Sequence, residues 1–265
     1  MNKIFCLLVV IAVFCECSRR EENHVFTTEV MNSYTPVKDQ GSSQTCWIYA
    51  MLAAIETEHI MRGDSVNLSA AFVEKMLERE PNCPPSRRGM GYIAIEMIQK
   101  YGVCGYDAMP TTATHAPRQV FMLGAVYTPQ EFARSVCAPG EYIALTFDIE
   151  DTYYNMVECH EPDNWMKKKL LNVSIDSILA ITERAVRSGH GVCWESKRHA
   201  MAIVGIAHDE KGRKYFIMKN SWGEHGRHNG LEYMSYRYFR RHTLAVTLNR
   251  EAASMDSTLT YSASM

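Results

Sequence analysis

The strongest structural constraint in this chain is a pair of apolar runs joined by a short polar turn. The runs HAMAIVGIA (199–207) and KYFIMK (214–219) are typical of strands, and DEKG (209–212) separates them. They predict a β-hairpin. Further strands are predicted by EYIALTF (141–147) and by GVCW just before the hairpin, with EPDN (161–164) as a turn. The second half of the chain therefore predicts an antiparallel sheet.

The register of this hairpin brings two chemically useful residues together. If Asp209 and Gly212 face each other at the turn, His199 lies nearly opposite Trp222 and within two residues of Asn220. Diagonal neighbours on an antiparallel ladder are about 7–8 Å apart at the backbone, which side chains can bridge. We therefore expect His199 and Asn220 to be partners.

Helical periodicity dominates the first half of the chain. A helix is predicted from Cys46 to about Met61, capped by Ser43 or Thr45 and ended by Gly63. Its apolar stripe comprises Trp47, Met51, Ala54 and Ile55. Further helices are predicted after Asn67-Leu68-Ser69 (with Phe72, Met76 and Leu77), over Tyr92–Tyr101 and over about Ile175–Arg187, and EPNCPPSRRG (80–89) is a turn-rich loop. Helices followed by a sheet predict an α+β protein of two lobes that meet at a cleft.

The stretch QGSSQTCWIYA (40–50) places Cys46 at the start of the first predicted helix. A helix N-terminus and a neighbouring imidazolium both favour a thiolate. If this helix packs against the hairpin, His199 forms the ion pair and later protonates a leaving amine, while Asn220 orients the imidazole. Gln40 and the Cys46 backbone N–H then stabilise an oxyanion. The alternatives are an inert core cysteine, a core histidine and a surface glutamine.

Three motifs resemble the papain superfamily of cysteine peptidases. They are Q-G-S-x-x-C-W around Cys46, R-H-A-M-A-I-V-G around His199 and K-N-S-W-G around Asn220. The resemblance implies a papain-like fold, with a helical N-terminal lobe, an antiparallel β-sheet or barrel C-terminal lobe and the active site in the cleft between them. It also implies hydrolysis of peptide bonds through an acyl-enzyme on Cys46, a peptide or protein substrate, no cofactor and no metal.

Some details are closer to the bleomycin-hydrolase and bacterial aminopeptidase branch of that superfamily. Ser43 stands where papain and the cathepsins carry a second cysteine, and RGMGYIAIEMIQKYGV and EPDNW resemble the bacterial group. Arg88-Gly89 stands where the family has the paired glycines that line its substrate cleft. We therefore expect the arginine to narrow the cleft or to bind an acidic group of the substrate. The family's second tryptophan is replaced at Gly226, whereas Trp222 remains to shield the bond between His199 and Asn220.

The N-terminus predicts export. Lys3 precedes the uncharged run 4–15, which is too short to cross a bilayer, and residues 1–17 resemble a secretory signal with a possible lipid anchor. Residues 18–250 are then the peptidase domain and 251–265 a flexible tail, which in the bleomycin-hydrolase branch enters the cleft. In an oxidising compartment cysteines tend to pair, but the six cysteines of the mature chain have no regular spacing and predict no disulfide framework, which leaves one or two disulfides open.

The sequence disfavours two other functions and leaves two alternatives open. A net charge of −2 gives no support for nucleic-acid binding. His225 and His228 lie in a Gly-rich loop without nearby cysteine or carboxylate ligands, which favours a solvated loop over a metal site. Two alternatives to a peptidase stay open: an acyl or amide transferase with the same triad, and a catalytically inactive homologue that binds peptides. Oligomeric state is not predicted.

Overall fold

The computed structural model describes residues 25–122 and 124–254. The predicted signal (1–17) and residues 255–265 of the predicted tail lie outside this range. The helical half contains α2 (Cys46–Met61), α3 (Ala70–Met76), the 3₁₀ helix η1 (Leu77–Arg79), α4 (Gly91–Tyr101) and α5 (Pro129–Val136), with a small hairpin of β2 (Val120–Met122) and β3 (Ala125–Tyr127). None of the described helices is both long and apolar enough to span a bilayer.

The larger sheet has the strand order β10-β9-β8-β7-β11-β4-β6-β5, and β1 pairs with β8 outside this path. Its strands are β1 (Phe26–Met31), β4 (Tyr142–Thr146), β5 (Met156–Glu158), β6 (Lys169–Asn172), β7 (Val192–Glu195), β8 (Ala200–Asp209), β9 (Lys214–Lys219), β10 (Leu231–Ser235) and β11 (Ala245–Asn249). The pairing of β4 with β6 is parallel, and the other pairings given for this sheet are antiparallel. The predicted antiparallel sheet is therefore confirmed in its main part.

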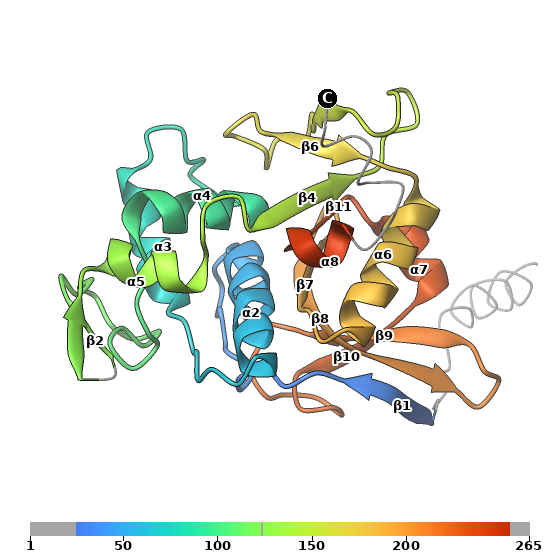
Figure 1. The fold of residues 1–265 in the computed structure, drawn as a ribbon, viewed down its shortest axis with the longest axis horizontal. Coiled ribbons are helices and arrows are strands. Elements are labelled where there is room, and N and C mark those ends of the chain that lie inside the picture. Colours follow the sequence, from blue (N-terminus) through green and yellow to red (C-terminus); the bar gives the residue numbers. More distant parts are fainter. Residues whose placement is uncertain (1–24, 123, 255–265) are drawn as a thin grey trace, which may run out of the picture.

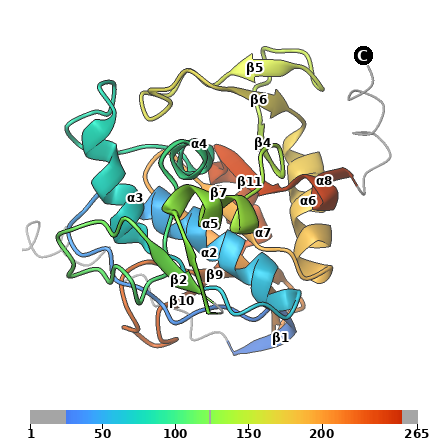
Figure 2. The ribbon, with the colours of Figure 1, turned by 60° about the vertical axis from the view of Figure 1, so that its left-hand side comes forward.

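Two layers of helices enclose the sheet (Figure 1). One face packs against α6 (Ile175–Arg187), α7 (Tyr236–His242) and α8 (Arg250–Ser254) through a buried apolar cluster. The other face approaches α2, beyond which lie α3, α4 and α5 (Figure 2). Alternate residues of β8 serve the two faces, because Ile203 belongs to the α6 cluster and Ala202 to a cluster with Ala53 of α2.

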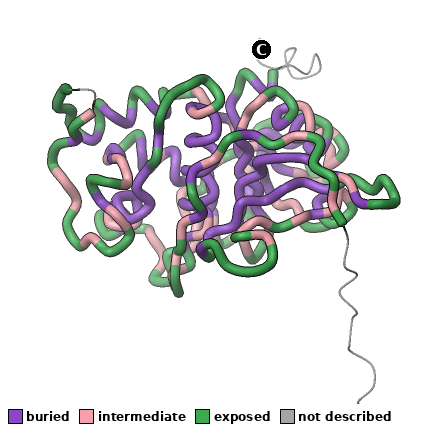
Figure 3. The backbone as a smooth tube through the Cα atoms, turned by 90° about the horizontal axis from the view of Figure 1, so that it is seen from below, coloured by how far each residue is buried: buried purple, intermediate pink, exposed green. Residues whose placement is uncertain are grey.

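Helix α2 is the central element of the molecule, and its burial differs from the prediction. Every residue from Trp47 to His59 is buried, so the predicted apolar stripe was wrong in extent. Close packing explains the difference: a Cβ on Gly191, just before β7, would stand 2.4 Å from the carbonyl oxygen of Ala54. In Figure 3 the buried backbone gathers in the interior of the molecule, and the exposed backbone lies mostly at its periphery. A helix surrounded by both lobes carries no solvent face.

Local signals placed most of the predicted elements correctly. The helices over 46–61 and 175–187 have the predicted bounds, α4 begins one residue early at Gly91, and Ser69 caps α3 through the amide of Phe72. The strands predicted over 141–147, 199–207 and 214–219 correspond to β4, β8 and β9. The predicted two-lobe α+β architecture is thus confirmed.

Two predictions about the ends of elements need correction. Thr45 is the N-cap residue of α2, but its side chain makes no capping bond and its hydroxyl donates to Glu74 instead. Residues 251–254 of the predicted flexible tail belong to α8, where Ala252 and Ala253 are buried. The six cysteines of the described residues are all unbridged here.

A buried ionic cluster links the segments that lead to the cleft. Glu56 of α2 is fully buried, and its carboxylate accepts from Lys38 Nζ at 2.5 Å and from the Leu68 amide at 2.6 Å. The Lys219 ammonium lies 3.8 Å from the same carboxylate and donates to the Thr35 hydroxyl at 2.7 Å. Glu56 therefore connects α2 to the segment before Gln40 and to the end of β9.

Removal of the Glu56 carboxylate is expected to lower the free energy of unfolding. Glu56→Ala leaves the buried Lys219 without a counter-charge and the Leu68 amide without an acceptor, and breaking such a pair costs about 3–5 kcal/mol. We expect urea unfolding, followed by tryptophan fluorescence, to show a loss of this size.

The matched control is Glu96→Ala on α4, which removes a half-exposed ion pair with Lys168. Exposed pairs contribute roughly 0–1 kcal/mol. Equal losses in the two variants would contradict a structural role for the Glu56 cluster.

Candidate active site

A cleft of about 320 Å³ lies between the two lobes and contains most of the predicted site residues. It is lined by Gln40, Ser43, Gln44, Cys46, Trp47, Arg88, Gly89, Asp163, Glu195, Ser196, Arg198, His199, Ala200 and Trp222. Asn220 is buried behind His199. Residues predicted from three separate motifs therefore meet at one place.

Cys46 is the first residue of α2, and its sulfur lies beside the strand that follows His199. The backbone amides of Ala200 and Trp47 hydrogen-bond to the sulfur and lower its pKa. Burial has the larger effect and raises the pKa of the thiol above its ordinary value, and the charge of Glu195 acts in the same direction. The helix N-terminus alone thus does not produce the predicted thiolate; a positive partner is needed.

His199 has a well-defined orientation. Its Nε2 lies 2.8 Å from Asn220 Oδ1, and its ring stacks on Trp222 with centroids 4.8 Å apart. Asn220 Oδ1 also accepts from the Ser221 amide, and Asn220 Nδ2 donates to Glu232 at 2.5 Å, which together set the orientation of the amide. Because Oδ1 can only accept, the imidazole proton belongs on Nε2, and Nδ1 is the basic nitrogen.

The predicted hairpin register holds at the end near the cleft. Ala202 pairs with Lys219 and Ile203 with Met218, the pairing that places His199 opposite Trp222. An irregularity between Ile203 and Gly205 then shifts the ladder by one residue toward the turn. This bulge is a local correction to the prediction, and it leaves the contact of His199 with Asn220 intact.

Gln40 is tied to the loop that follows Asn220. The backbone N–H of Gln40 donates to the carbonyl oxygen of Ser221 at 2.8 Å. Its side-chain Oε1 accepts from the Ser221 hydroxyl at 2.5 Å, and Nε2 donates to Ser43 O at 2.5 Å. Since Nε2 carries two hydrogens, one remains for a ligand in the cleft that Gln40 lines.

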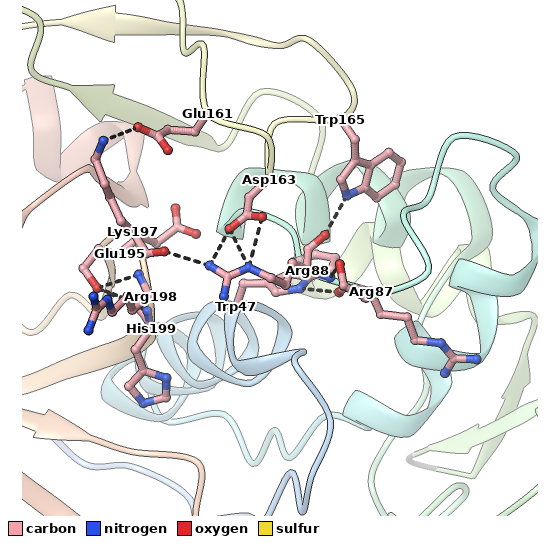
Figure 4. A network of polar contacts seen from close by, with 12 residues as sticks. Trp47, Arg87, Arg88, Glu161, Asp163, Trp165, Glu195, Lys197, Arg198 and His199 are labelled. Carbon is pink, nitrogen blue, oxygen red and sulfur yellow. Dashed lines mark hydrogen bonds and ion pairs between the residues drawn. The ribbon is translucent and has the colours of Figure 1, made fainter.

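Arg88 and Gly89 form the opposite rim of the cleft. The Arg88 guanidinium binds Asp163 with Nε and Nη2 at 3.0 and 2.7 Å from Oδ2, and Nη2 also donates to Lys197 O at 2.8 Å (Figure 4). A Cβ on Gly89 would stand 2.7 Å from the Trp47 indole, so only glycine fits at this distance. Arg88 thus has an acidic partner within the chain.

Three residues of this site were not predicted from the sequence. Asp163 was read only as part of a turn, and Glu232 lies on β10, a strand that was not predicted. Glu195 follows the predicted GVCW strand directly and is 3 % exposed. Strand alternation alone gives no signal for a carboxylate that is buried beside a cleft.

No metal site accompanies this arrangement. Among residues 25–122 and 124–254, no group of three or more His, Cys, Asp or Glu side chains is placed to hold a metal ion. His225 and His228 lie instead in the loop beside Trp222, on a second hollow lined in part by Tyr233.

Comparisons with known proteins agree with this geometry. The model of the papain family cysteine proteases matches residues 25–247. Among curated proteins, the thiol protease SEN102 of Hemerocallis is 27% identical over 72% of this chain and 48% of its own length. Ananain of Ananas comosus is 25% identical over 71% of this chain and 49% of its own length. The chain thus spans about half the length of these curated relatives.

Solved structures show the same fold at low sequence identity. PepW of Lactobacillus rhamnosis matches with a TM-score of 0.66 and 14% identity, covering 89% of this chain and 84% of that chain. A mite-allergen structure from a study of Blo t 1 and Der p 1 matches with a TM-score of 0.54 and 17% identity, covering 82% and 67%. The family match over most of the chain, together with this fold, shows that the chain belongs to the papain family of cysteine proteases.

Proposed function

We propose that the chain is a peptidase that cleaves peptide bonds through an acyl-enzyme on Cys46. The observation that carries the proposal is that Cys46, His199 and Gln40 line one cleft while Asn220 binds His199 from behind. These four groups supply a nucleophile, a base that becomes an acid, an oxyanion donor and an orienting group.

The first step is proton transfer from the Cys46 thiol to His199 Nδ1. Because burial raises the pKa of the thiol, the thiolate is stabilised mainly as the partner of the resulting imidazolium. Asn220 accepts the other ring proton, from Nε2, and keeps the ring in one orientation. Trp222 covers one face of the ring and limits competition from water.

The remaining steps follow from these positions. The thiolate forms a bond to the peptide carbonyl carbon, and the oxygen gains negative charge that the Cys46 amide and Gln40 Nε2 stabilise. As the C–N bond breaks, the imidazolium gives its proton to the departing amine. Water then loses a proton to His199 and attacks the thioester, which releases the acid and restores the Cys46 thiol.

The proposal also includes the branch of the family, the export of the protein and its class of substrate. Ser43 and the segments RGMGYIAIEMIQKYGV and EPDNW support an aminopeptidase related to the bleomycin-hydrolase branch. Residues 1–17 support export, with a peptide or protein as substrate. A transferase would use the same thioester with an amine as acceptor, and an inactive homologue would bind peptides without turnover.

Labelling with the peptidyl epoxide E-64 tests the nucleophile. We expect one equivalent to add to the wild-type chain, measured by intact mass, and none to Cys46→Ala, because the epoxide alkylates the activated thiolate. Cys83→Ala is the matched control: Cys83 is also partly exposed, but it does not line the cleft, so this variant should still label.

Peptide turnover then separates the alternatives. We expect a peptide library to be hydrolysed by wild type and not by Cys46→Ala. Folded wild-type protein that fails to label would refute the nucleophile assignment and favour a peptide-binding homologue. Labelling accompanied by amine-dependent acyl transfer, without hydrolysis, would favour the transferase.

Glu232 offers a second test, because it acts only through Asn220. Glu232→Ala removes the acceptor of Asn220 Nδ2, so the amide can rotate and the imidazole loses its fixed orientation. We expect kcat to fall on the order of 10-fold with little change in KM, since small misplacements at a reacting centre are costly. The pH profile of Cys46 alkylation by iodoacetamide should change as well.

Glu232→Gln should restore most of the activity, because its amide oxygen still accepts from Asn220. Glu224→Ala, an exposed carboxylate in the neighbouring loop, is the control. An unchanged alkylation profile in Glu232→Ala would contradict a positioning role.

A further inference from the structure

Glu195 is a buried carboxyl group that the proposed reaction does not use. It ends β7, pairs across the sheet with Ala200 and Ala245, and is 3 % exposed. It nevertheless lines the same cleft as Cys46 and His199. A strand end therefore brings a carboxyl group to the inner wall of the cleft, beside the Arg88–Asp163 rim (Figure 4).

Only half of this carboxyl group is satisfied within the protein. Oε1 accepts from the Gly91 amide at the start of α4, at 2.6 Å. Oε2 is buried and has no hydrogen-bond partner among the described residues. Such atoms are rare in folded proteins and cost about 1–3 kcal/mol, so an orphan oxygen on a residue that lines a cleft points to a ligand that completes it.

Gly91 packs closely beside this carboxyl group. A Cβ at this position would stand 2.7 Å from Cys193 Sγ and 3.5 Å from Glu195 Oε2. A side chain at Gly91 would therefore collide with Cys193 beside the carboxyl group.

The charged groups around Glu195 leave it without a counter-ion. Arg88 is engaged by Asp163 and by Lys197 O, so the charges of that rim pair cancel. The other titratable groups that face this part of the cleft or interact with it are Cys46, Tyr92, Asp163, Cys193, Arg198 and His199. Burial and the charge of Asp163 raise the pKa of Glu195 to about 8, while the Gly91 amide lowers it. Glu195 is thus a weak acid whose ionised form has no cationic side-chain partner among the described residues.

We propose that Glu195 is a specificity residue that receives a cationic group of the peptide substrate, the ammonium of lysine or the guanidinium of arginine, close to the scissile bond. A cation satisfies Oε2 with N–H donors and compensates the buried charge. A neutral aliphatic side chain leaves Oε2 unpaired, and an acidic one is repelled. In the sequence, Arg88 suggested that the cleft binds an acidic group. The role of Glu195 gives the opposite preference, for a cationic group.

Proximity to the nucleophile gives this subsite a second effect. The negative charge of Glu195 raises the pKa of Cys46. A bound cation offsets that charge, so a substrate with a basic group also favours the thiolate that attacks it. The inference rests on the proposed peptidase function and deepens it by naming the substrate class.

The test compares N-acetylated fluorogenic peptides that differ at one position among arginine, citrulline, leucine and glutamate, placed at either of the two residues before the scissile bond. Citrulline keeps the shape of arginine without the charge. We expect wild type to prefer arginine over citrulline in kcat/KM on the order of 30-fold, because loss of one partner of a buried charge pair is costly. Glu195→Gln should reduce this ratio to near one.

Two controls make the ratio interpretable. Glu161→Gln removes a carboxylate that binds Lys197 outside the cleft, and it should leave the ratio unchanged. Free-amine versions of the citrulline peptides distinguish the two sources of a cation: a gain with the free amine that Glu195→Gln abolishes would assign the site to the substrate α-ammonium. In both cases Glu195 receives a cation.

A wild-type measurement is independent of whether Glu195→Gln folds. Because the pKa of Glu195 is about 8, the group is mainly neutral below that pH and anionic above it. The arginine-to-citrulline ratio should therefore rise with pH toward a plateau above about 8, and ionisations of Cys46 and His199 cancel in the ratio.

Failure of this inference is distinct from failure of the peptidase function. E-64 labelling and hydrolysis of any peptide in the series establish the peptidase. If these hold while wild type shows no preference for a cation with either terminus, or if the preference survives in Glu195→Gln, the role assigned to Glu195 is wrong.

Discussion

The buried carboxylate of Glu56 makes the interaction on which the geometry of the cleft depends. It lies on α2, ten residues after Cys46 in sequence, and it binds Lys38, two residues before Gln40. Lys219, its second cation, directly precedes Asn220. Burial lowers the pKa of Lys219 to about 8, which reflects how little water reaches the cluster. One buried anion thus holds the helix of Cys46, the segment before Gln40 and the strand before Asn220 in fixed relation.

Hydrogen bonds and close packing also hold the two sides of the cleft together. Ser221 connects the two sides of the site, because its hydroxyl donates to Gln40 and its amide to Asn220. Gly191 lets α2 approach the sheet closely enough for the sulfur of Cys46 to reach the Ala200 amide. The opposite wall is built by the Arg88–Asp163 pair and by Gly89 against Trp47.

Local sequence signals predicted a large part of this fold and of the site. Helical periodicity and caps placed α2 and α6, and the hairpin placed His199 beside Asn220, since all depend on neighbours in sequence. Strands β1, β10 and β11 were missed, because their partners are distant or follow an irregular loop. The bulge after Ile203 and the complete burial of α2 depend on packing, which periodicity does not report.

The sequence by itself determined the reactive groups, their order and the partnership of His199 with Asn220, because a hairpin register is a local property. Only the tertiary structure decided that Cys46 meets them, since that contact requires α2 to be enclosed between the two lobes. The same enclosure raises the pKa of the thiol and leaves Glu195 Oε2 unpaired at the cleft. Both effects arise from loss of water around a charged or polar group, and water is excluded only when distant segments pack together.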